Sequence, residues 1–367
     1  MIYNWQQNDW PEFRYLSNEV EDTLFSFVEQ LGHVSGILNS FSDDIRIEAI
    51  INTMVAEAIK TSEIEGEYLS RQDVTSSIRN NLGLNETQEA VKDKMSKGAG
   101  ELMVAVRKTY ADPLTIEMLF TWHEMLLGES KRITVGAWRK HTDPMQVISG
   151  PIGKEKIHFE APPSSNVPKE INAFITWFND TAPGGKKEIK KAPIRSAIAH
   201  LYFETIHPFE DGNGRIGRAI AEKALSQTIG RPILLSLSKA IEAKKKLYYA
   251  SLEEAQKSNE ITPWVNYFVT TILEAQTEAK NLVNFILIKS KFFDRFSPVL
   301  NERQLKVVQR MFEAGPSEFE GGMSAKKYMS IAKTSKATAT RDLQQLSELQ
   351  VFKVEGGGRG TNYSLNI

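Results

Sequence analysis

The amino-acid sequence predicts a mainly α-helical fold, with a β-hairpin in the middle of the chain and a winged helix-turn-helix domain at its C-terminal end. Apolar residues recur at spacings of three and four along most of the 367 residues, which is the period of an amphipathic helix. Two segments, 133–162 and 351–367, depart from this period and carry β-prone runs beside glycines or prolines. A composition of 41% hydrophobic and 25% charged residues indicates a folded globular protein rather than a disordered chain.

The N-terminal part of the chain is expected to be a helical region over residues 1–109. The spacing of apolar residues predicts helices over 19–38, 44–65, 70–82 and 86–109. Asp43 or Asp44 can cap the second helix, and Gly66 can end it because glycine adopts the left-handed conformation without strain. The aromatic residues that precede these helices are expected to pack over them; they are Trp5, Trp10 and Phe13.

The middle of the chain, residues 110–294, is expected to be the second domain. A helix is predicted over 114–127, directly after Pro113, and the β-prone runs 146–149 and 156–160 predict a hairpin within a long loop. Further helices are predicted over 167–180, 192–206, 213–229, 239–257 and 261–292.

The third predicted domain covers residues 295–367. Helices are predicted over 301–313, 324–332 and 335–349, followed by a strand, a glycine-rich turn and a second strand. This order is that of a winged helix, which is a variant of the helix-turn-helix motif.

Composition excludes several classes of protein. The chain has no cysteine, so disulfides, thiolate metal sites and cysteine nucleophiles are excluded. The formal net charge of −1 argues against a surface that is basic throughout. The N-terminus lacks the pattern of a secretory signal, and no stretch approaches 18 consecutive apolar residues. We therefore expect no membrane contact and a cytoplasmic location.

The twelve residues 207–218, HPFEDGNGRIGR, hold the strongest functional signal. A helix is expected to end at His207, because Pro208 restricts the backbone of the residue before it. Gly212 and Gly214 allow the backbone to approach a ligand closely. The next helix begins at these glycines, so its N-terminal N–H groups are expected to form an anion site.

The charged side chains of the same segment suit a polyphosphate ligand. Arg215 and Arg218 lie three residues apart on one helix face and provide two guanidinium groups. Asp211 is a carboxylate able to hold Mg²⁺, and His207 can accept a proton near pH 7. The opposing interpretation is a surface loop with a structural histidine and salt-bridged arginines. It would suit any one of these residues alone, but the combination favours a nucleotide-processing site.

This segment resembles the motif of the Fic family, HPFx(D/E)GNGRxxR, at every defined position. Residues from about 110 to 275 also resemble the helical core and hairpin of that family. Fic enzymes mostly transfer the AMP moiety of ATP to a hydroxyl side chain of a protein. The resemblance thus implies a protein adenylyltransferase that uses ATP as substrate and Mg²⁺ as cofactor. Related Doc kinases carry lysine at the position of Gly214, so glycine there favours nucleotidyl transfer over phosphorylation.

The resemblance also implies a role for each residue of the motif. His207 would deprotonate a Ser, Thr or Tyr hydroxyl of the target, which then attacks the α-phosphate and displaces pyrophosphate. Asp211 would hold the Mg²⁺ ion, and Phe209 would anchor the loop in the core. The phosphates would be held by the backbone of Gly212, Asn213 and Gly214, with Arg215 at the β-phosphate and Arg218 at the γ-phosphate.

Family relatives carry a hairpin flap that aligns the target segment beside the site. Residues 145–160 match this flap, and Val147, Ile148 and Ser149 are expected nearest the site. His158 in the same hairpin is expected to be a solvent-facing strand residue, with a second catalytic group as the alternative.

Two further segments are assigned by resemblance or by position. Residues 246–256 resemble the adenine-side segment of related enzymes, so Tyr248, Tyr249 and Gln256 are candidates for lining the base. Simple packing of the two tyrosines is the alternative. His200 lies seven residues before the motif on the same helix face, and we expect a structural role for it.

The second predicted helix ends in TSEIEGE and resembles the inhibitory motif of the family, (S/T)xxxE(G/N). Thr61 and Glu65 are four residues apart and share a helix face. In such relatives the glutamate pairs with the second arginine of the motif, which here is Arg218. A carboxylate at that place would repel the γ-phosphate and misalign the α-phosphate. Some relatives use the same glutamate to hydrolyse AMP from modified targets, and the sequence does not separate the two activities.

Charge is unevenly distributed between the predicted domains. Residues 295–367 hold 11 basic and 7 acidic residues, a net of +4, so the remainder carries −5. The helix over 335–349 begins with lysine, threonine and arginine residues, and Arg359 lies in the predicted wing. These features make DNA a candidate partner of residues 295–367, with a protein or a second subunit as the alternative.

Two classes of function are therefore carried forward. The leading one is an autoinhibited adenylyltransferase that modifies a protein hydroxyl, itself included, and forms a homodimer. The rival is a winged-helix DNA-binding regulator whose Fic core only senses nucleotide. His207 and Asp211 favour the enzyme, because a sensor needs no catalytic base.

Overall fold

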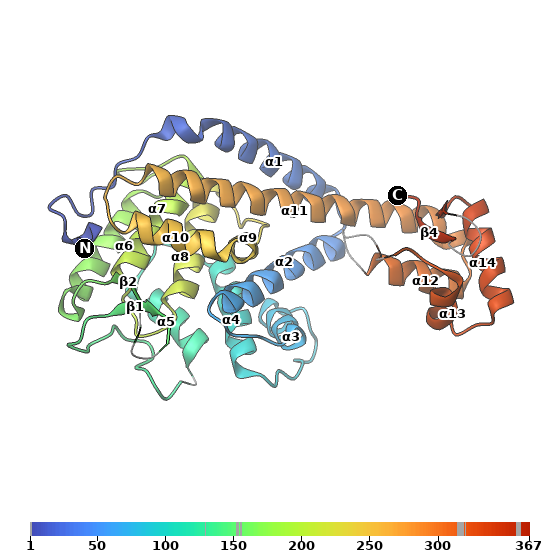
Figure 1. Cartoon of the computed structure of the whole chain (residues 1–367), viewed down its shortest axis with the longest axis horizontal. Helices are drawn as coiled ribbons and strands as arrows, with labels where there is room; N and C mark the ends of the chain where they lie inside the picture. The colour runs from blue at the N-terminus through green and yellow to red at the C-terminus, as the bar shows by residue number, and fades with distance from the viewer. Residues whose placement is uncertain are drawn as a thin grey trace. The chain divides into compact units, whose positions relative to one another are not determined.

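The computed structural model describes residues 2–128, 130–151, 154, 156–313, 319, 321–356 and 361–367 (Figure 1). Over these residues the fold is mainly helical with two small β-hairpins, which confirms the predicted fold class. The chain forms two compact units. The first contains Met1–His33 and Ile47–Ala279, and the second contains Val34–Arg46 and Lys280–Ile367.

Most of the predicted helices are present with bounds close to those expected. The helices of the described residues are α1 Glu21–Ser40, α2 Asp43–Ile64, α3 Arg71–Leu82, α4 Lys94–Lys108, α5 Ile116–Leu127, α6 Val167–Asp180, α7 Ala192–Ile206, α8 Asn213–Ile229, α9 Leu237–Ala243, α10 Lys245–Ala255, α11 Thr262–Phe296, α12 Glu302–Phe312, α13 Ala325–Ala332 and α14 Lys336–Glu348. The strands β1 Gln146–Ser149 and β2 Lys156–Glu160 form one antiparallel pair, and β3 Phe352–Glu355 and β4 Asn362–Leu365 form the other.

Two helix boundaries differ from the prediction. Helix α4 begins at Lys94 rather than at residue 86, because the Asp93 side chain accepts hydrogen bonds from the N–H groups of Met95 and Ser96 and caps the helix there. The helix predicted over 239–257 is two helices, α9 and α10, separated at Lys244, whose φ of −128° leaves the helical region. No glycine or proline marks that break in the sequence.

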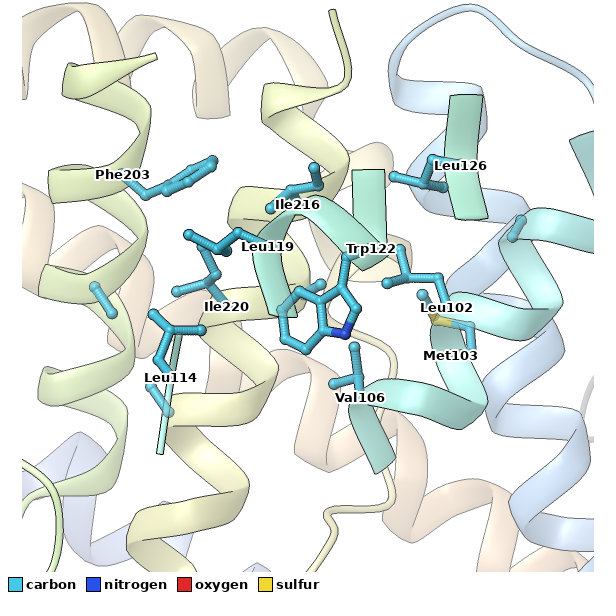
Figure 2. Close-up of a cluster of buried hydrophobic side chains, with 14 of the residues drawn as sticks. Leu102, Met103, Val106, Leu114, Leu119, Trp122, Leu126, Phe203, Ile216 and Ile220 are labelled. Atoms are coloured by element: carbon cyan, nitrogen blue, oxygen red, sulfur yellow. The ribbon is translucent and has the colours of Figure 1, made fainter. Parts of the chain in front are cut away.

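The core of the first unit forms around α7 and α8, which pack against each other (Figure 1). Every residue of α7 is buried, including the polar side chains of Arg195, His200 and Glu204, so this helix is enclosed on all sides. Figure 2 shows the indole of Trp122 from α5 among Leu102 and Val106 of α4, with Ile220 of α8 nearby. Within the described residues no helix is long and apolar enough to cross a membrane.

Ile220 offers a mild test of this packing, because its side chain is fully buried. We expect Ile220→Val to lower the free energy of unfolding by about 0.5–1.5 kcal/mol, since one buried methylene is lost and a small cavity remains. Ile288→Val is the matched control, because Ile288 is 41% exposed. Urea unfolding of the two variants measures the difference, and equal midpoints would contradict the packing described.

The leader before α1 was predicted to pack over the N-terminal helices; Phe13 does adjoin the core cluster that contains Phe27 of α1, but the hydrogen bonds and ring contacts of its aromatic residues are chiefly with later elements. The indole N–H of Trp5 donates to the carbonyl of Glu160 at 2.7 Å, and that of Trp10 donates to Glu170 at 2.9 Å. Trp10 and Phe13 also pack edge-to-face on Tyr202 of α7. The leader is thus attached to the hairpin and to the α6–α7 layer, which lie more than 140 residues further along the chain.

The second unit has its own core beneath α12, α13 and α14, with Tyr328 and Leu346 among its fully buried residues. The buried carboxylate of Asp342 accepts hydrogen bonds from Arg303 at 3.1 Å and from the Tyr328 hydroxyl at 2.9 Å. Three helices followed by the β3–β4 hairpin is the order that the sequence predicted. Arg359, expected in the wing, lies outside the described residues.

Candidate functional site

The site forms at the turn between α7 and α8. Helix α7 ends at His207, which has φ 49° and ψ 60° and thus adopts the left-handed conformation that is unusual for a side chain other than glycine. Gly212, with φ 81°, precedes the first residue of α8. The Asn213 side chain closes the loop, because it accepts from the N–H of Phe209 and donates to the carbonyl of Phe209, both at 2.9 Å.

Two residues outside the motif hold this turn in place, and the sequence analysis did not single out either. Arg139 is 1% exposed and donates to the carbonyl of His207 at 2.8 Å and to that of Pro162 at 2.5 Å. His123 accepts from the N–H of Gly136, so its other ring nitrogen carries the proton and donates to the carbonyl of Asp211 at 3.1 Å. Since Arg139 and His123 bind backbone groups, which every residue has, no pattern in the sequence indicates these contacts.

Phe209 anchors the loop from below, as predicted. Its ring is fully buried and stacks on His123 with centroids 4.1 Å apart. Burial lowers the pKa of His123, so this imidazole stays neutral beneath the loop.

A cavity of about 820 Å³ opens above the turn. His207, Asp211, the backbone run 212–214, the flap residues 146–149 and part of α10 all line it. Burial, reinforced by the charge of Arg139, lowers the pKa of His207 to about 4. The imidazole is therefore neutral at pH 7 and free to accept a proton.

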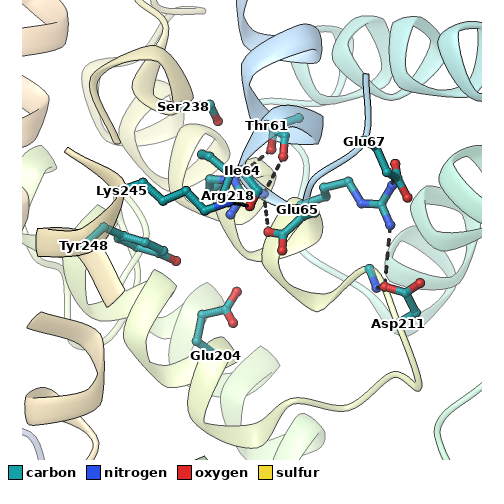
Figure 3. A network of polar contacts seen from close by, with 12 residues as sticks. Thr61, Ile64, Glu65, Glu67, Glu204, Asp211, Arg218, Ser238, Lys245 and Tyr248 are labelled. Atoms are coloured by element: carbon teal, nitrogen blue, oxygen red, sulfur yellow. Dashed lines mark hydrogen bonds and ion pairs between the residues drawn. The ribbon is translucent and has the colours of Figure 1, made fainter. Parts of the chain in front are cut away.

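The anion site at the start of α8 holds a carboxylate of the chain itself (Figure 3). Glu65 follows the last residue of α2, and its Oε1 lies 2.8 Å from Nη2 of Arg218. A Cβ atom placed on Gly214 would lie only 2.3 Å from the same oxygen. The carboxylate of Glu65 therefore lies directly over the backbone that is expected to hold phosphate.

Arg218 is almost fully enclosed, at 1% exposure, and is bound to the end of α2 by three hydrogen bonds. Its Nε donates to the Thr61 hydroxyl at 2.7 Å, and its Nη2 donates to the Thr61 carbonyl at 2.9 Å and to Glu65. Burial acts to raise the pKa of Glu65, but the charge and hydrogen bond of Arg218, together with the charges of Arg215 and Lys245, outweigh it and the pKa is lowered. Glu65 thus stays ionised. Gly66, with φ 83°, ends the helix directly after it, as the sequence predicted.

A second carboxylate of the same segment engages the first motif arginine. Nη1 of Arg215 lies 2.5 Å from Oε2 of Glu67, and its Nη2 lies 3.6 Å from Oδ1 of Asp211. Glu67 was not predicted as a site residue, because the inhibitory motif defines no residue after its glycine. Both arginines of the motif are therefore paired with carboxylates from the segment that follows α2.

The residues present fit one divalent cation held together with phosphate oxygens. Asp211 lines the cavity with a side chain that is 60% exposed, and one of its oxygens accepts from the Gly212 N–H at 2.5 Å. Mg²⁺ needs only one or two protein carboxylates when phosphates and water complete its shell. Among the described residues no group of three or more His, Asp or Glu side chains could hold a metal by itself.

The predicted adenine-side residues come from α10 and the residue after it, and all three line the cavity. Tyr248 is buried, and its hydroxyl lies 2.8 Å from Nε2 of His200, which gives His200 the structural role expected of it. Tyr249 is 39% exposed, and its hydroxyl donates to the carbonyl of Ile64 at 3.4 Å. Gln256 donates to the carbonyl of Glu204 at 3.3 Å.

The flap is attached to α10 by side chains. Val147 pairs with Phe159 and Ile148 with Ile157, so His158 is an extra residue in β2 that forms a bulge. Its ring lies between Ser149, 2.6 Å from Nε2, and Glu253 of α10, 2.7 Å from Nδ1. His158 therefore does not simply face solvent, as was expected.

One buried carboxyl group beside the base was also missed. Glu204 of α7 is 4% exposed, and its Oε2 lies 3.7 Å from Nδ1 of His207. Burial raises the pKa of Glu204 to about 8; the charge of Arg218 opposes this rise and that of Glu65 adds to it.

Taken together, these residues form an anion-binding loop beside a buried, neutral base, the arrangement of a nucleotide-processing site. Residues 113–225 match the model of the Fic/DOC family, and residues 3–84 match a domain of unknown function, DUF4172. The chain carries a Fic domain.

Proteins that are named as adenylyltransferases resemble part of the chain. It is 27% identical over 157 residues to the protein adenylyltransferase fic-1 of Caenorhabditis elegans, which covers 42% of this chain and 27% of that protein. It is also 27% identical over 228 residues to the probable protein adenylyltransferase aq_aa38 of Aquifex aeolicus, which covers 61% of this chain and 59% of that one. The chain thus spans less than two thirds of the length of these relatives.

Solved structures share the fold. A Fic family protein from Desulfovibrio desulfuricans superposes with a TM-score of 0.53 at 20% identity, covering 97% of this chain and 98% of the other. A Fic domain containing signaling protein from Bacteroides thetaiotaomicron gives 0.52 at 18% identity, covering 71% and 97%. At these identities the likeness establishes the fold.

Proposed function

We propose that this protein is an autoinhibited protein adenylyltransferase, which transfers AMP from ATP to a Ser, Thr or Tyr hydroxyl of a protein. One observation carries the proposal: the anion site at the start of α8, beside the neutral base His207, holds the carboxylate of Glu65 in the place of a phosphate. Since an ionised carboxylate is held there by Arg218, the site is suited to bind negative charge.

In this proposal the chemistry is positioning and electrostatic stabilisation. His207 takes the proton of the target hydroxyl, whose oxygen bonds to the α-phosphorus while pyrophosphate leaves. The N–H groups of residues 212–214 and the guanidinium groups of Arg215 and Arg218 hold the phosphates. Asp211 would hold Mg²⁺, which neutralises phosphate charge when bound.

The end of α2 acts as the inhibitor in this proposal. The γ-phosphate and Glu65 compete for Arg218, and the β-phosphate and Glu67 compete for Arg215. Nucleotide that binds while both carboxylates are in place is held in an orientation in which the α-phosphate is not aligned for attack. The same Glu65, positioned beside the loop, also supports hydrolysis of AMP from a modified target as a second activity of the site.

The class of reaction is tested by measuring which labelled phosphate of ATP is transferred to the protein. The Glu65→Gly protein, incubated with Mg²⁺ and ATP labelled in the α-phosphate, should gain the mass and label of AMP, while ATP labelled in the γ-phosphate should transfer none. His207→Ala in the same background should reduce incorporation by about two to four orders of magnitude, because general-base catalysis is lost. Transfer of the γ-label, or full incorporation without His207, would contradict the proposal.

DNA binding by the second unit is a second candidate function, supported by the surface of α14. Ser335 caps this helix by accepting from the N–H of Thr338, and Lys336, Thr340 and Arg341 in its first turns are exposed. Helices α13 and α14 are separated by three residues, as in a helix-turn-helix.

A mobility-shift assay of the whole chain on duplex DNA at 50 and 200 mM salt tests this candidate. Binding should weaken as salt rises, because phosphate contacts release counterions, and a variant carrying Lys336→Ala and Arg341→Ala should bind more weakly at both concentrations. Lys289→Ala is the control, since that lysine belongs to α11 rather than to α14. Absence of salt-sensitive binding would exclude this role.

A further inference from the structure

A carboxyl group that the proposed chemistry does not use lies one helical turn before the base. Glu204 and His207 are three residues apart at the end of α7 and share a face of the helix. Oε2 of Glu204 lies 3.7 Å from Nδ1 of His207, slightly too far for a hydrogen bond. Neither Nδ1 of His207 nor Oε1 of Glu204 has a hydrogen-bond partner within the described chain. Each of these two neighbouring side chains thus keeps one buried polar atom without a well-formed hydrogen bond, although the backbone of Glu204 also acts on His207 in the direction that raises its pKa.

Helix α8 makes room for this carboxyl group. A Cβ atom on Gly217 would lie 2.2 Å from Oε1 of Glu204 and 3.2 Å from Nδ1 of His200. Any side chain at Gly217 would therefore displace the carboxyl group from its position between the two helices. The glycine in GRIGR, which the Fic motif leaves undefined, is explained by this contact.

Two further buried polar residues, His200 and Tyr248, lie near Glu204. Nδ1 of His200 also lacks a partner among the described residues, and it faces the same point above Gly217 as Glu204 does. The other nitrogen of His200 lies 2.8 Å from the hydroxyl of Tyr248. Buried polar groups of Glu204 and His200 therefore meet above Gly217, and His200 is joined in turn to Tyr248, which lines the cavity.

We propose that Glu204 is a positioning residue, which accepts a hydrogen bond from Nδ1–H of His207 and so keeps Nε2 free to take the proton of the target hydroxyl. This inference rests on the proposed function, because it takes His207 as the base. A shift of less than 1 Å from the present 3.7 Å would complete the hydrogen bond, a change that is common when a site closes around its substrate. A base oriented by a neighbouring carboxylate is the arrangement used by many nucleophile-activating sites.

The proton balance of the step is simple. The O–H bond of the target breaks, its proton moves to Nε2 of His207, and its oxygen bonds to the α-phosphorus of ATP as pyrophosphate leaves. The proton on Nδ1 stays in place, and the ionised Glu204 stabilises the imidazolium without receiving a proton. A protonated Glu204 would instead donate to Nδ1, which leaves the proton on Nε2 and prevents that atom from acting as the base.

The charges that face Glu204 determine which of the two forms is present. Burial raises its pKa to about 8, Arg218 from α8 acts to lower it, and Glu65 from the end of α2 raises it. The neutral groups Tyr248 of α10 and His200 of α7 complete its surroundings. The proposal requires the ionised form of Glu204, so AMP transfer should increase with pH as this carboxyl group loses its proton.

Two measurements test the inference in the active Glu65→Gly protein. The first is the rate of AMP transfer at saturating ATP between pH 6 and 9. This rate should rise with pH as Glu204 ionises. In Glu204→Gln the rise should be flattened. This variant should also lower kcat at pH 8.5 by about 10-fold or more, while its KM for ATP stays within twofold of the parent. The second is the ¹⁵N spectrum of the His207 ring, which should pass from the Nε2–H to the Nδ1–H tautomer over the same pH range, and should not do so in Glu204→Gln.

The possible outcomes separate this inference from the proposed function. Equal pH profiles and equal His207 tautomers with and without Glu204 would overturn it, even if AMP transfer is confirmed. No AMP transfer at any pH would remove the proposed function, and the tautomer measurement would still report on the Glu204–His207 pair. Gly217→Ala is a second variant, expected to displace the carboxyl group and to reproduce the flattened profile while Glu204 remains present.

Discussion

Replacing Glu65 by glycine should raise the rate of AMP transfer by about 5- to 150-fold, the usual range for the coupling of two sites. The change removes the carboxylate that lies 2.8 Å from Arg218 and over Gly214, so this carboxylate no longer competes with a nucleotide phosphate for Arg218. The measurement is the initial rate of label incorporation from ATP labelled in the α-phosphate, relative to the unaltered chain.

Glu63→Gly is a matched control for this change. Glu63 lies in the same helical turn, but its carboxylate pairs with Lys60 rather than with a motif arginine. It should leave the rate within about twofold of the parent. Glu67→Gln, which releases Arg215, should add to the gain of Glu65→Gly if both carboxylates exclude phosphates. An unchanged rate in Glu65→Gly, in a protein whose activity still requires His207, would disprove the inhibitory role.

Replacing Arg139 by leucine should remove AMP transfer and lower the free energy of unfolding by at least about 3 kcal/mol, because several buried acceptors lose a charged donor at once. The guanidinium group donates to the carbonyls of His207 and Pro162 and to the Ser164 hydroxyl. The turn that presents the base would lose its attachment to the loop after the flap. Stability is measured by urea unfolding and activity by label incorporation in the Glu65→Gly background.

Lys140→Leu is the control for Arg139→Leu, because Lys140 is the next residue in the sequence and is exposed. It should change stability by no more than about 0.5 kcal/mol and leave transfer intact. Arg139→Lys should fall between the two, since a lysine keeps the charge but cannot reach all the acceptors at once. A stable and active Arg139→Leu protein would show that the turn is held by other groups.

The sequence allowed us to predict those site residues that lie next to one another in the chain. Residues 207–218 include the proposed base, the proposed metal ligand, the glycine loop and both motif arginines, so a local pattern was sufficient to predict them. Glu65 is 153 residues from its partner Arg218 in the sequence, and only the resemblance to a known motif connected the two. The structure places the two in direct contact.

The supporting residues could not be found in the same way. Arg139 and His123 act through backbone carbonyls and N–H groups, which every residue possesses, so their partners leave no trace in the sequence. Glu204 and Gly217 form a pair only because α7 and α8 pack together, and neither residue is unusual alone. The break at Lys244 similarly has no glycine or proline to mark it. Such features depend on tertiary contacts rather than on local preference.

In the proposed inhibition, the left-handed turn at Gly66 would determine how the carboxylates after α2 leave the motif arginines. Glu65 and Glu67 lie on either side of this glycine, at a helix terminus, where local opening requires far less free energy than unfolding of the domain. Release can then be described as an equilibrium between a closed form and a minor open form. A 100-fold gain on removing Glu65 would correspond to about 2.8 kcal/mol and to an open form near 1% of the molecules. Basal activity would measure that minor population directly, and a partner that binds the opened terminus would raise activity in proportion to its preference for that form.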